Sequence, residues 1–227
     1  MVLAAKIFVV REETDLETLA MKLKDYRVEE TYEQEEHKIP LLTEVKDLML
    51  RTNSLEGVFA RDQVIFLPHH DKMVSVPKTL EAPFIFTKYG DRIFLTVMEK
   101  KARANNIAND LSKTLFIIAG RIVEARILPE VLKKFHEDNF EDTKVIFFDD
   151  VDIPNIEKLS LYGSALGDTS LYNDYLNHGK IWYTVVKTRK YGYVVGVTRD
   201  SVVTVFSRIE PSDLMTYLTS EIFPLIE

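Results

Sequence analysis

The chain has 227 residues, of which 46% are hydrophobic and 29% charged, with a formal net charge of -7 and no cysteine. Such a chain can bury a core unaided, and the lack of thiols excludes disulfide scaffolds, thiolate zinc sites and cysteine nucleophiles. The negative charge argues against general wrapping of nucleic acid, and no apolar run approaches the roughly 18 residues of a membrane span. We therefore expect a cytoplasmic protein with no membrane partner; its two glutamines among many charged residues fit a thermophilic source.

The first fifty residues predict one strand and two helices. Lys6–Val10 is apolar and rich in β-branched residues, as in a strand, and Leu16, Leu19 and Leu23 give the next segment a buried helical stripe. Glu29–Glu36 has no apolar period and predicts a solvated linker or a helix extension. Pro40 suits a helix start, and an apolar face follows it at Leu41, Val45 and Leu48.

Strands dominate the next fifty residues, and a helix closes them. Short strands are predicted at 57–60, 63–67 and 73–76, and the clearest hairpin joins 84–87 to 92–98 through Tyr89-Gly90-Asp91. From Lys101 the period becomes helical, with Gly120 as the stop.

The second half predicts a strand at 121–127, a helix from Pro129 and a strand at 144–148 buried on both faces. Weak periodicity over 149–168 indicates a loop or a domain boundary. Three further strands at 180–188, 191–198 and 201–208 predict a meander, which a helix from Pro211 closes.

The predicted fold class is α+β, with a mostly antiparallel sheet flanked by helices and the C-terminal three-stranded meander closed by a helix. The predicted domains are residues 1–150, of mixed α/β structure, and 151–227, the meander and its helix. Residues 91–117 and 200–226 both run turn, strand, linker and amphipathic helix, which makes them a candidate internal duplication.

The first candidate catalytic residues are Glu99 and Lys101, between a strand and a helix. This Glu-x-Lys pattern resembles the motif of metal-dependent nucleases, where the carboxylate binds Mg²⁺ and the lysine steadies the attacking water. Such nucleases need another acidic residue on the preceding strand, which 84–87 does not supply, and Asp62 and Glu81 are substitutes without a predicted place. The alternative is that Glu99 and Lys101 are solvated charges.

The candidate metal ligands are Asp149, Asp150 and Asp152, directly after the predicted buried strand. The carboxyl ends of parallel strands are where ligands bind, and clustered carboxylates can hold a divalent cation such as Mg²⁺. Aspartates also cap turns after strands, which is the structural alternative. The five histidines show no zinc-ligand spacing.

The candidate nucleic-acid contacts are Lys187, Arg189 and Lys190, in a predicted turn with Tyr191 and Tyr193 nearby. Cations beside aromatic rings suit phosphate contact and base stacking, although turns gather solvated charges in any protein.

No catalytic constellation is complete in this sequence. The leading hypothesis is therefore a non-enzymatic binding or regulatory protein that acts as a homo-oligomer or with a protein partner, through exposed strand edges such as 201–208. The alternatives are a Mg²⁺- or Mn²⁺-dependent enzyme acting on phosphodiesters or nucleotides, and a nucleic-acid-binding protein without cleavage.

Overall fold

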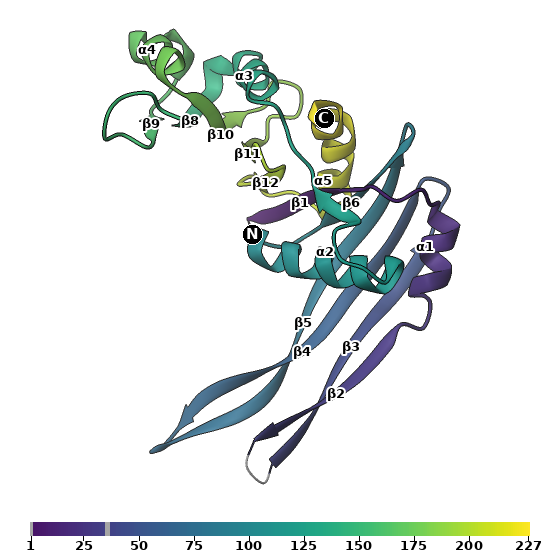
Figure 1. Ribbon diagram of the computed structural model, residues 1–227. Coiled ribbons are helices and arrows are strands. Elements are labelled where there is room, and N and C mark those ends of the chain that lie inside the picture. Colours follow the sequence, from purple (N-terminus) through teal and green to yellow (C-terminus); the bar gives the residue numbers. More distant parts are fainter. Residues whose placement is uncertain (1, 35–36) are drawn as a thin grey trace. The chain divides into compact units, whose positions relative to one another are not determined.

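The computed structural model describes residues 2–34 and 37–227 and shows a mixed α+β protein in which antiparallel strands predominate (Figure 1). Two compact units make up the chain. The inserted unit is Val9–Val123, and the terminal unit combines Met1–Phe8 with Glu124–Glu227. The two units divide the chain after Phe8 and after Val123, and the predicted domains 1–150 and 151–227 stay predictions. Within the described ranges, no helix is long and apolar enough to cross a membrane.

The inserted unit is a five-stranded antiparallel meander with two helices. Its strands follow the order β2-β3-β4-β5-β6. They are β2 (Arg27–Gln34), β3 (His37–Leu50), β4 (Ser54–His69), β5 (Lys72–Tyr89) and β6 (Arg92–Val97). The helix α1 (Leu16–Leu23) precedes the meander and α2 (Lys101–Phe116) follows it.

Both helices lie over the same face of this meander (Figure 1). The Lys22 ammonium of α1 donates to the Leu115 carbonyl of α2 at 2.6 Å, which joins the two helices. Apolar side chains of both helices are buried, as their period predicts, together with aromatic rings of the strands: Leu16, Leu19, Leu23, Ala104, Leu111, Phe59, Phe84 and Phe94. The hairpin predicted at Tyr89-Gly90-Asp91 is confirmed, with Tyr89 paired to Arg92.

Two predictions for residues 29–50 are wrong. The glutamate-rich segment is strand β2 up to Gln34, and residues 35–36 of the predicted linker lie outside the described residues. The helix predicted from Pro40 is strand β3, because β2 and β4 pair with it on either side. The apolar positions of this segment fit both periods, and tertiary pairing decides between them.

In the terminal unit the strands follow the order β1-β12-β11-β10-β8-β9, and they belong to the same 12-stranded sheet as β2–β6. Its strands are β1 (Leu3–Val10), β8 (Thr143–Asp149), β9 (Leu159–Tyr162), β10 (Lys180–Lys187), β11 (Val194–Thr198) and β12 (Val202–Val205). Short β7 (Ile122–Glu124) pairs with β1. The helices are α3 (Pro129–Glu137), α4 (Ser170–His178) and α5 (Pro211–Tyr217), and α5 runs on into a π-helical turn, Leu218–Ile222.

The predicted C-terminal meander is present, since β11 pairs with both β10 and β12 before α5 begins. The prediction that 201–208 offers a free edge is wrong, because β12 lies between β11 and β1. Strand β8 is also not buried on both faces: Ile146 and Phe148 are buried, whereas Val145 and Phe147 are partly exposed.

Candidate functional site

Two long β-ribbons leave the body of the inserted unit and diverge (Figure 1). The β3–β4 ladder ends at the pair Thr43 and Arg61, while β2–β3 and β4–β5 continue as separate two-stranded ribbons. We call residues 29–34 with 37–42 the β2–β3 arm, and Gln63–Lys78 the β4–β5 arm. Two-stranded ribbons are marginally stable in water by themselves, so contact with another surface would stabilise either arm.

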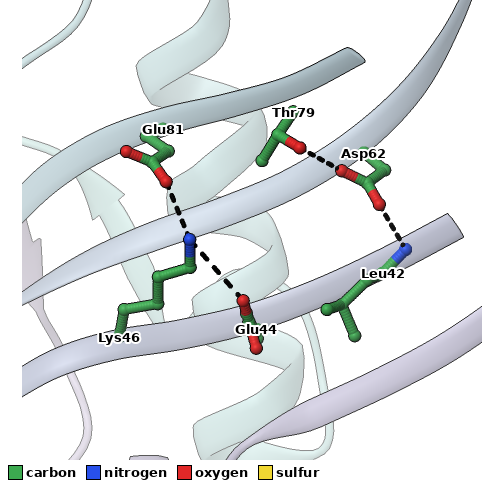
Figure 2. A network of polar contacts seen from close by, with 6 residues as sticks. All are labelled: Leu42, Glu44, Lys46, Asp62, Thr79 and Glu81. Atoms are coloured by element: carbon green, nitrogen blue, oxygen red, sulfur yellow. Dashed lines mark hydrogen bonds and ion pairs between the residues drawn. The ribbon is translucent and has the colours of Figure 1, made fainter. Parts of the chain in front are cut away.

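The arms separate because Asp62 takes the place of a backbone acceptor (Figure 2). Its carboxylate accepts from the Leu42 amide at 3.0 Å and from the Thr79 hydroxyl at 2.6 Å. The next residue with the same backbone orientation as Leu42 is Pro40, which has no N–H to donate. If the β3–β4 ladder continued, Leu42 and Pro40 would each donate a hydrogen bond to β4. The Leu42 amide donates to Asp62 instead, and Pro40 cannot donate, so the two strands separate here.

A lysine of β3 forms an ion pair with β5 near this point (Figure 2). Lys46 of β3 lies 2.8 Å from Glu81 of β5 and 3.7 Å from Glu44 of its own strand. The hydrogen bond to Glu81 is the main cause that raises the pKa of Lys46. For Asp62, the Thr79 hydroxyl and then the Leu42 amide lower the pKa. Both groups therefore remain charged at neutral pH.

Apolar side chains cover both faces of the β4–β5 arm. Leu67 pairs with Val74 on one face, and they are 48% and 40% exposed. Phe66 and Met73 point to the opposite face, since successive residues of a strand alternate, and they are 47% and 62% exposed. An arm that is apolar on both faces leaves this surface in water unless another surface covers it.

The two arms differ in charge. The segment 29–42 carries five glutamates, one lysine and one histidine, whereas the segment 63–78 carries two lysines, two histidines and a single aspartate. Neither arm was predicted from the sequence. A signal was available for the β4–β5 arm, because the four successive apolar residues Val64–Leu67 cannot all lie on one face of a strand. They therefore indicate a strand that is apolar on both faces.

A cavity of about 370 Å³ lies at the base of the arms, between the sheet and α2. The buried residues Phe59 and Ala82 contribute to its lining. Charged pairs surround them, with Arg61 2.8 Å from Asp110 and Arg103 3.0 Å from Glu99. We call this cavity the basal groove.

The structure brings Glu99 into the basal groove together with Asp62 and Glu81, the two carboxylates that the sequence could not place. Lys101, in the first turn of α2, is not part of its lining. Each carboxylate already has its own partner: Glu99 accepts from Arg103 and from the Lys100 amide, while the other two hold the contacts described above. Within residues 2–34 and 37–227, no cluster of three acidic or histidine side chains is arranged to hold a metal ion.

The carboxylates of Asp149, Asp150 and Asp152 each face a basic side chain instead of one another. Asp149 contacts Arg199, and Asp150 lies 3.6 Å from Lys180. Asp152 lies 2.8 Å from His178. Burial, and to a smaller extent the charge of Asp150, raises the pKa of Asp149, while Arg199 opposes the rise. The metal site was expected because ligands bind at the carboxyl ends of parallel strands. This reason does not apply, since β8 is antiparallel to both of its neighbours.

The candidate nucleic-acid residues lie at the β10–β11 connection. Lys187 ends β10, and the next two cations have acidic partners, Arg189 with Glu141 at 3.4 Å and Lys190 with Glu221 at 2.7 Å. Tyr191 and Tyr193 stack with their ring centroids 5.6 Å apart. This turn therefore presents a partly neutralised cationic surface beside aromatic rings.

Replacing Asp62 with alanine is expected to release the Leu42 amide to solvent. Loss of a hydrogen bond worth about 1 kcal/mol should speed hydrogen exchange of this amide roughly five- to tenfold, which nuclear magnetic resonance can follow. Asp62→Asn retains an acceptor oxygen and should exchange more slowly than the alanine variant. Equal exchange in the wild type and Asp62→Ala would show that the carboxylate does not separate the arms.

Comparison with models of known protein families finds no match for this sequence, and comparison with proteins of curated function also finds none.

Proposed function

We propose that this chain is a non-enzymatic binding protein that acts as a homo-oligomer, in which the β4–β5 arm of one copy docks on the β2–β3 arm of a second copy. The observation that carries this proposal is the β4–β5 arm itself, whose two faces both expose apolar side chains. Burying apolar surface is favourable by about 25 cal/mol per Å². In a symmetric oligomer every copy buries the same apolar surface.

The charges of the arms favour a second copy over an unrelated partner. The β2–β3 arm is strongly acidic and the β4–β5 arm carries Lys72 and Lys78 with no glutamate. Opposite potentials attract across an interface, and in a symmetric dimer each copy supplies one arm of each sign. Within one copy, Asp62 and Pro40 keep the same two arms from pairing edge to edge.

Removing the exposed apolar side chains is expected to weaken the association. For Phe66→Ser with Met73→Ser we expect a loss of about 2 kcal/mol, a roughly 30-fold higher dissociation constant, measured by sedimentation velocity. The matched control is Ile118→Ser with Leu171→Ser, which removes two exposed apolar side chains outside both arms and should leave the association unchanged. A monomeric wild type at 100 µM would contradict the proposal.

A charge exchange tests which surface the arm meets. Lys72→Glu with Lys78→Glu should weaken the association. Adding Glu29→Lys with Glu33→Lys should restore part of it, because the segment 29–42 then carries three glutamates and three lysines and no longer repels the altered arm. If the fourfold variant associates no more tightly than Lys72→Glu with Lys78→Glu, the β4–β5 arm docks on a different surface.

A further inference from the structure

A second cavity, of about 610 Å³, lies in the terminal unit. It is formed by α3, the β10–β11 connection and the C-terminal helical turns, and its volume falls within the roughly 300–1,000 Å³ of small-molecule sites. Its apolar lining comes from two separate parts of the chain: Val131, Phe135, Pro224 and Leu225. We call it the Tyr217 pocket, after the residue that distinguishes it.

Tyr217 contributes to the wall of this pocket and has no exposed surface. Its hydroxyl is buried and forms no hydrogen bond with any residue of the described ranges. A buried polar group without a partner costs about 1–3 kcal/mol, so its retention calls for an explanation. The ring is held in place by two neighbours, with Tyr191 at 5.4 Å and Tyr193 at 6.1 Å between centroids.

The unpartnered hydroxyl is a hydrogen-bond donor. Burial raises the pKa of Tyr217, and the nearby Glu221 and Tyr191 raise it further, so the phenol keeps its proton at every physiological pH. A neutral phenol in an apolar wall can be satisfied by an acceptor oxygen of a bound molecule. A ligand that supplies a hydrogen-bond acceptor would therefore satisfy the Tyr217 hydroxyl.

The charged residues of the pocket do not select for a charged ligand. Three cations and three carboxylates belong to its lining: Lys134, Arg189, Lys190, Glu130, Asp138 and Glu221. Two of the cations are already compensated, Lys190 by Glu221 and Arg189 by Glu141. A ligand of either net sign would meet repulsion as well as attraction on this rim.

We propose that the Tyr217 pocket binds an uncharged, largely apolar small molecule whose carbonyl-type oxygen accepts a hydrogen bond from the Tyr217 hydroxyl. The apolar walls take the body of the ligand, and the hydroxyl fixes its orientation. This site goes beyond self-association through the arms, and it lies wholly within the terminal unit.

The ligand reaches the hydroxyl by displacing side chains of the rim. Lys190 is 66% exposed and its partner Glu221 lies on the π-helical turn directly after Tyr217. Single π-helical turns recur at functional sites because they set side chains at positions that a regular helix does not offer. Opening the exposed Lys190–Glu221 pair costs little, since such pairs contribute at most about 1 kcal/mol.

The probe that tests the site is Prodan, a fluorescent, uncharged naphthyl ketone whose emission responds to hydrogen bonding at its carbonyl. We expect one saturable site per chain. Tyr217→Phe should raise the dissociation constant roughly five- to tenfold and shift the emission of the bound probe. The same variant should not lower the melting temperature, because it removes a buried hydroxyl that no partner satisfies.

Three controls keep the result specific. Tyr193→Phe deletes the hydroxyl of a neighbouring ring outside the pocket lining and should bind like the wild type. Val131→Trp fills the cavity and should abolish binding. The naphthalene without the ketone should bind wild type and Tyr217→Phe alike.

Several outcomes would overturn the proposal: no saturable binding, equal affinity in the wild type and Tyr217→Phe, or undiminished binding in Val131→Trp. The arm variant Phe66→Ser with Met73→Ser should bind the probe as the wild type does, so loss of self-association and loss of this site are separate results.

Discussion

Lowering the pH from 7.5 to 5 is expected to reduce the free energy of unfolding of the terminal unit by about 2 kcal/mol through His136 alone. His136 is fully buried on α3, and burial lowers its pKa from 6.5 to about 4. Its Nδ1 lies 3.1 Å from the Tyr172 hydroxyl, which also contacts Glu137, and its Nε2 has no partner among the described residues. A protonated ring would hold a buried charge and an unpaired donor.

The free energy of unfolding falls with pH because the folded and unfolded states protonate His136 at different pH values. The unfolded chain takes up a proton near pH 6.5 and the folded protein only near pH 4, so the unfolded state binds more protons between these values and gains stability there as pH falls. Above pH 6.5 the effect is absent, and below pH 4 it is complete. Trp182, the only tryptophan, lies on β10 in the same unit, so its fluorescence during urea unfolding reports this equilibrium.

The variant His136→Gln separates this effect from the titration of carboxylates. It should flatten the dependence of unfolding free energy on pH between 5 and 7, whatever its stability at pH 7.5. A wild-type slope in His136→Gln would show that other groups cause the acid sensitivity.

Truncating Glu124 is expected to destabilise the terminal unit by about 3 kcal/mol. Lys6 of β1 has no exposed surface, and its ammonium lies 3.4 Å from the Glu124 carboxylate and 3.1 Å from the Asp200 carbonyl. Glu124→Ala removes a carboxylate that balances this buried charge, which is why the loss is large.

The reciprocal change should have a much smaller effect. Lys6→Met replaces the buried ammonium by an apolar chain of similar length, and Glu124 is partly exposed and can regain water. Exchanging a buried ion pair for apolar packing is often neutral or stabilising. Urea unfolding of both variants measures the asymmetry, and equal losses of unfolding free energy would contradict it.

The sequence predicted the elements whose signals are local. The period of α2 and the turn at Tyr89-Gly90-Asp91 each lie within a short window, and both are present. Strand β3 was mistaken for a helix because the evidence for it lies in β2 and β4, which pair with it. The division of the chain after Val123 was equally hidden, since it depends on β1 pairing with β12 at the other end of the sequence.

For the candidate sites too, the sequence predicted what lies within a short window and not the contacts between distant segments. Glu99 was noticed from its position after a strand, but its neighbours Asp62 and Glu81 come to it only because β4 pairs with β5 and β5 pairs with β6. The aspartates after β8 were evident as a cluster, whereas their basic partners Arg199, Lys180 and His178 lie tens of residues away in the sequence. Spacing reveals a cluster of charges, and only the fold reveals what neutralises it.

The pairing of β1 with β12 also has a consequence for how the protein is made. Leu3 pairs with Val205, so strand β1 is completed by a strand that is synthesised about 200 residues later. The inserted unit, Val9–Val123, holds the strands β2–β6 and a core of its own, and we expect it to fold before β12 is made. In nascent chains that stall before residue 202, residues 3–6 lack the partner that β12 supplies, and we expect proteases to cleave this segment faster than in the finished chain.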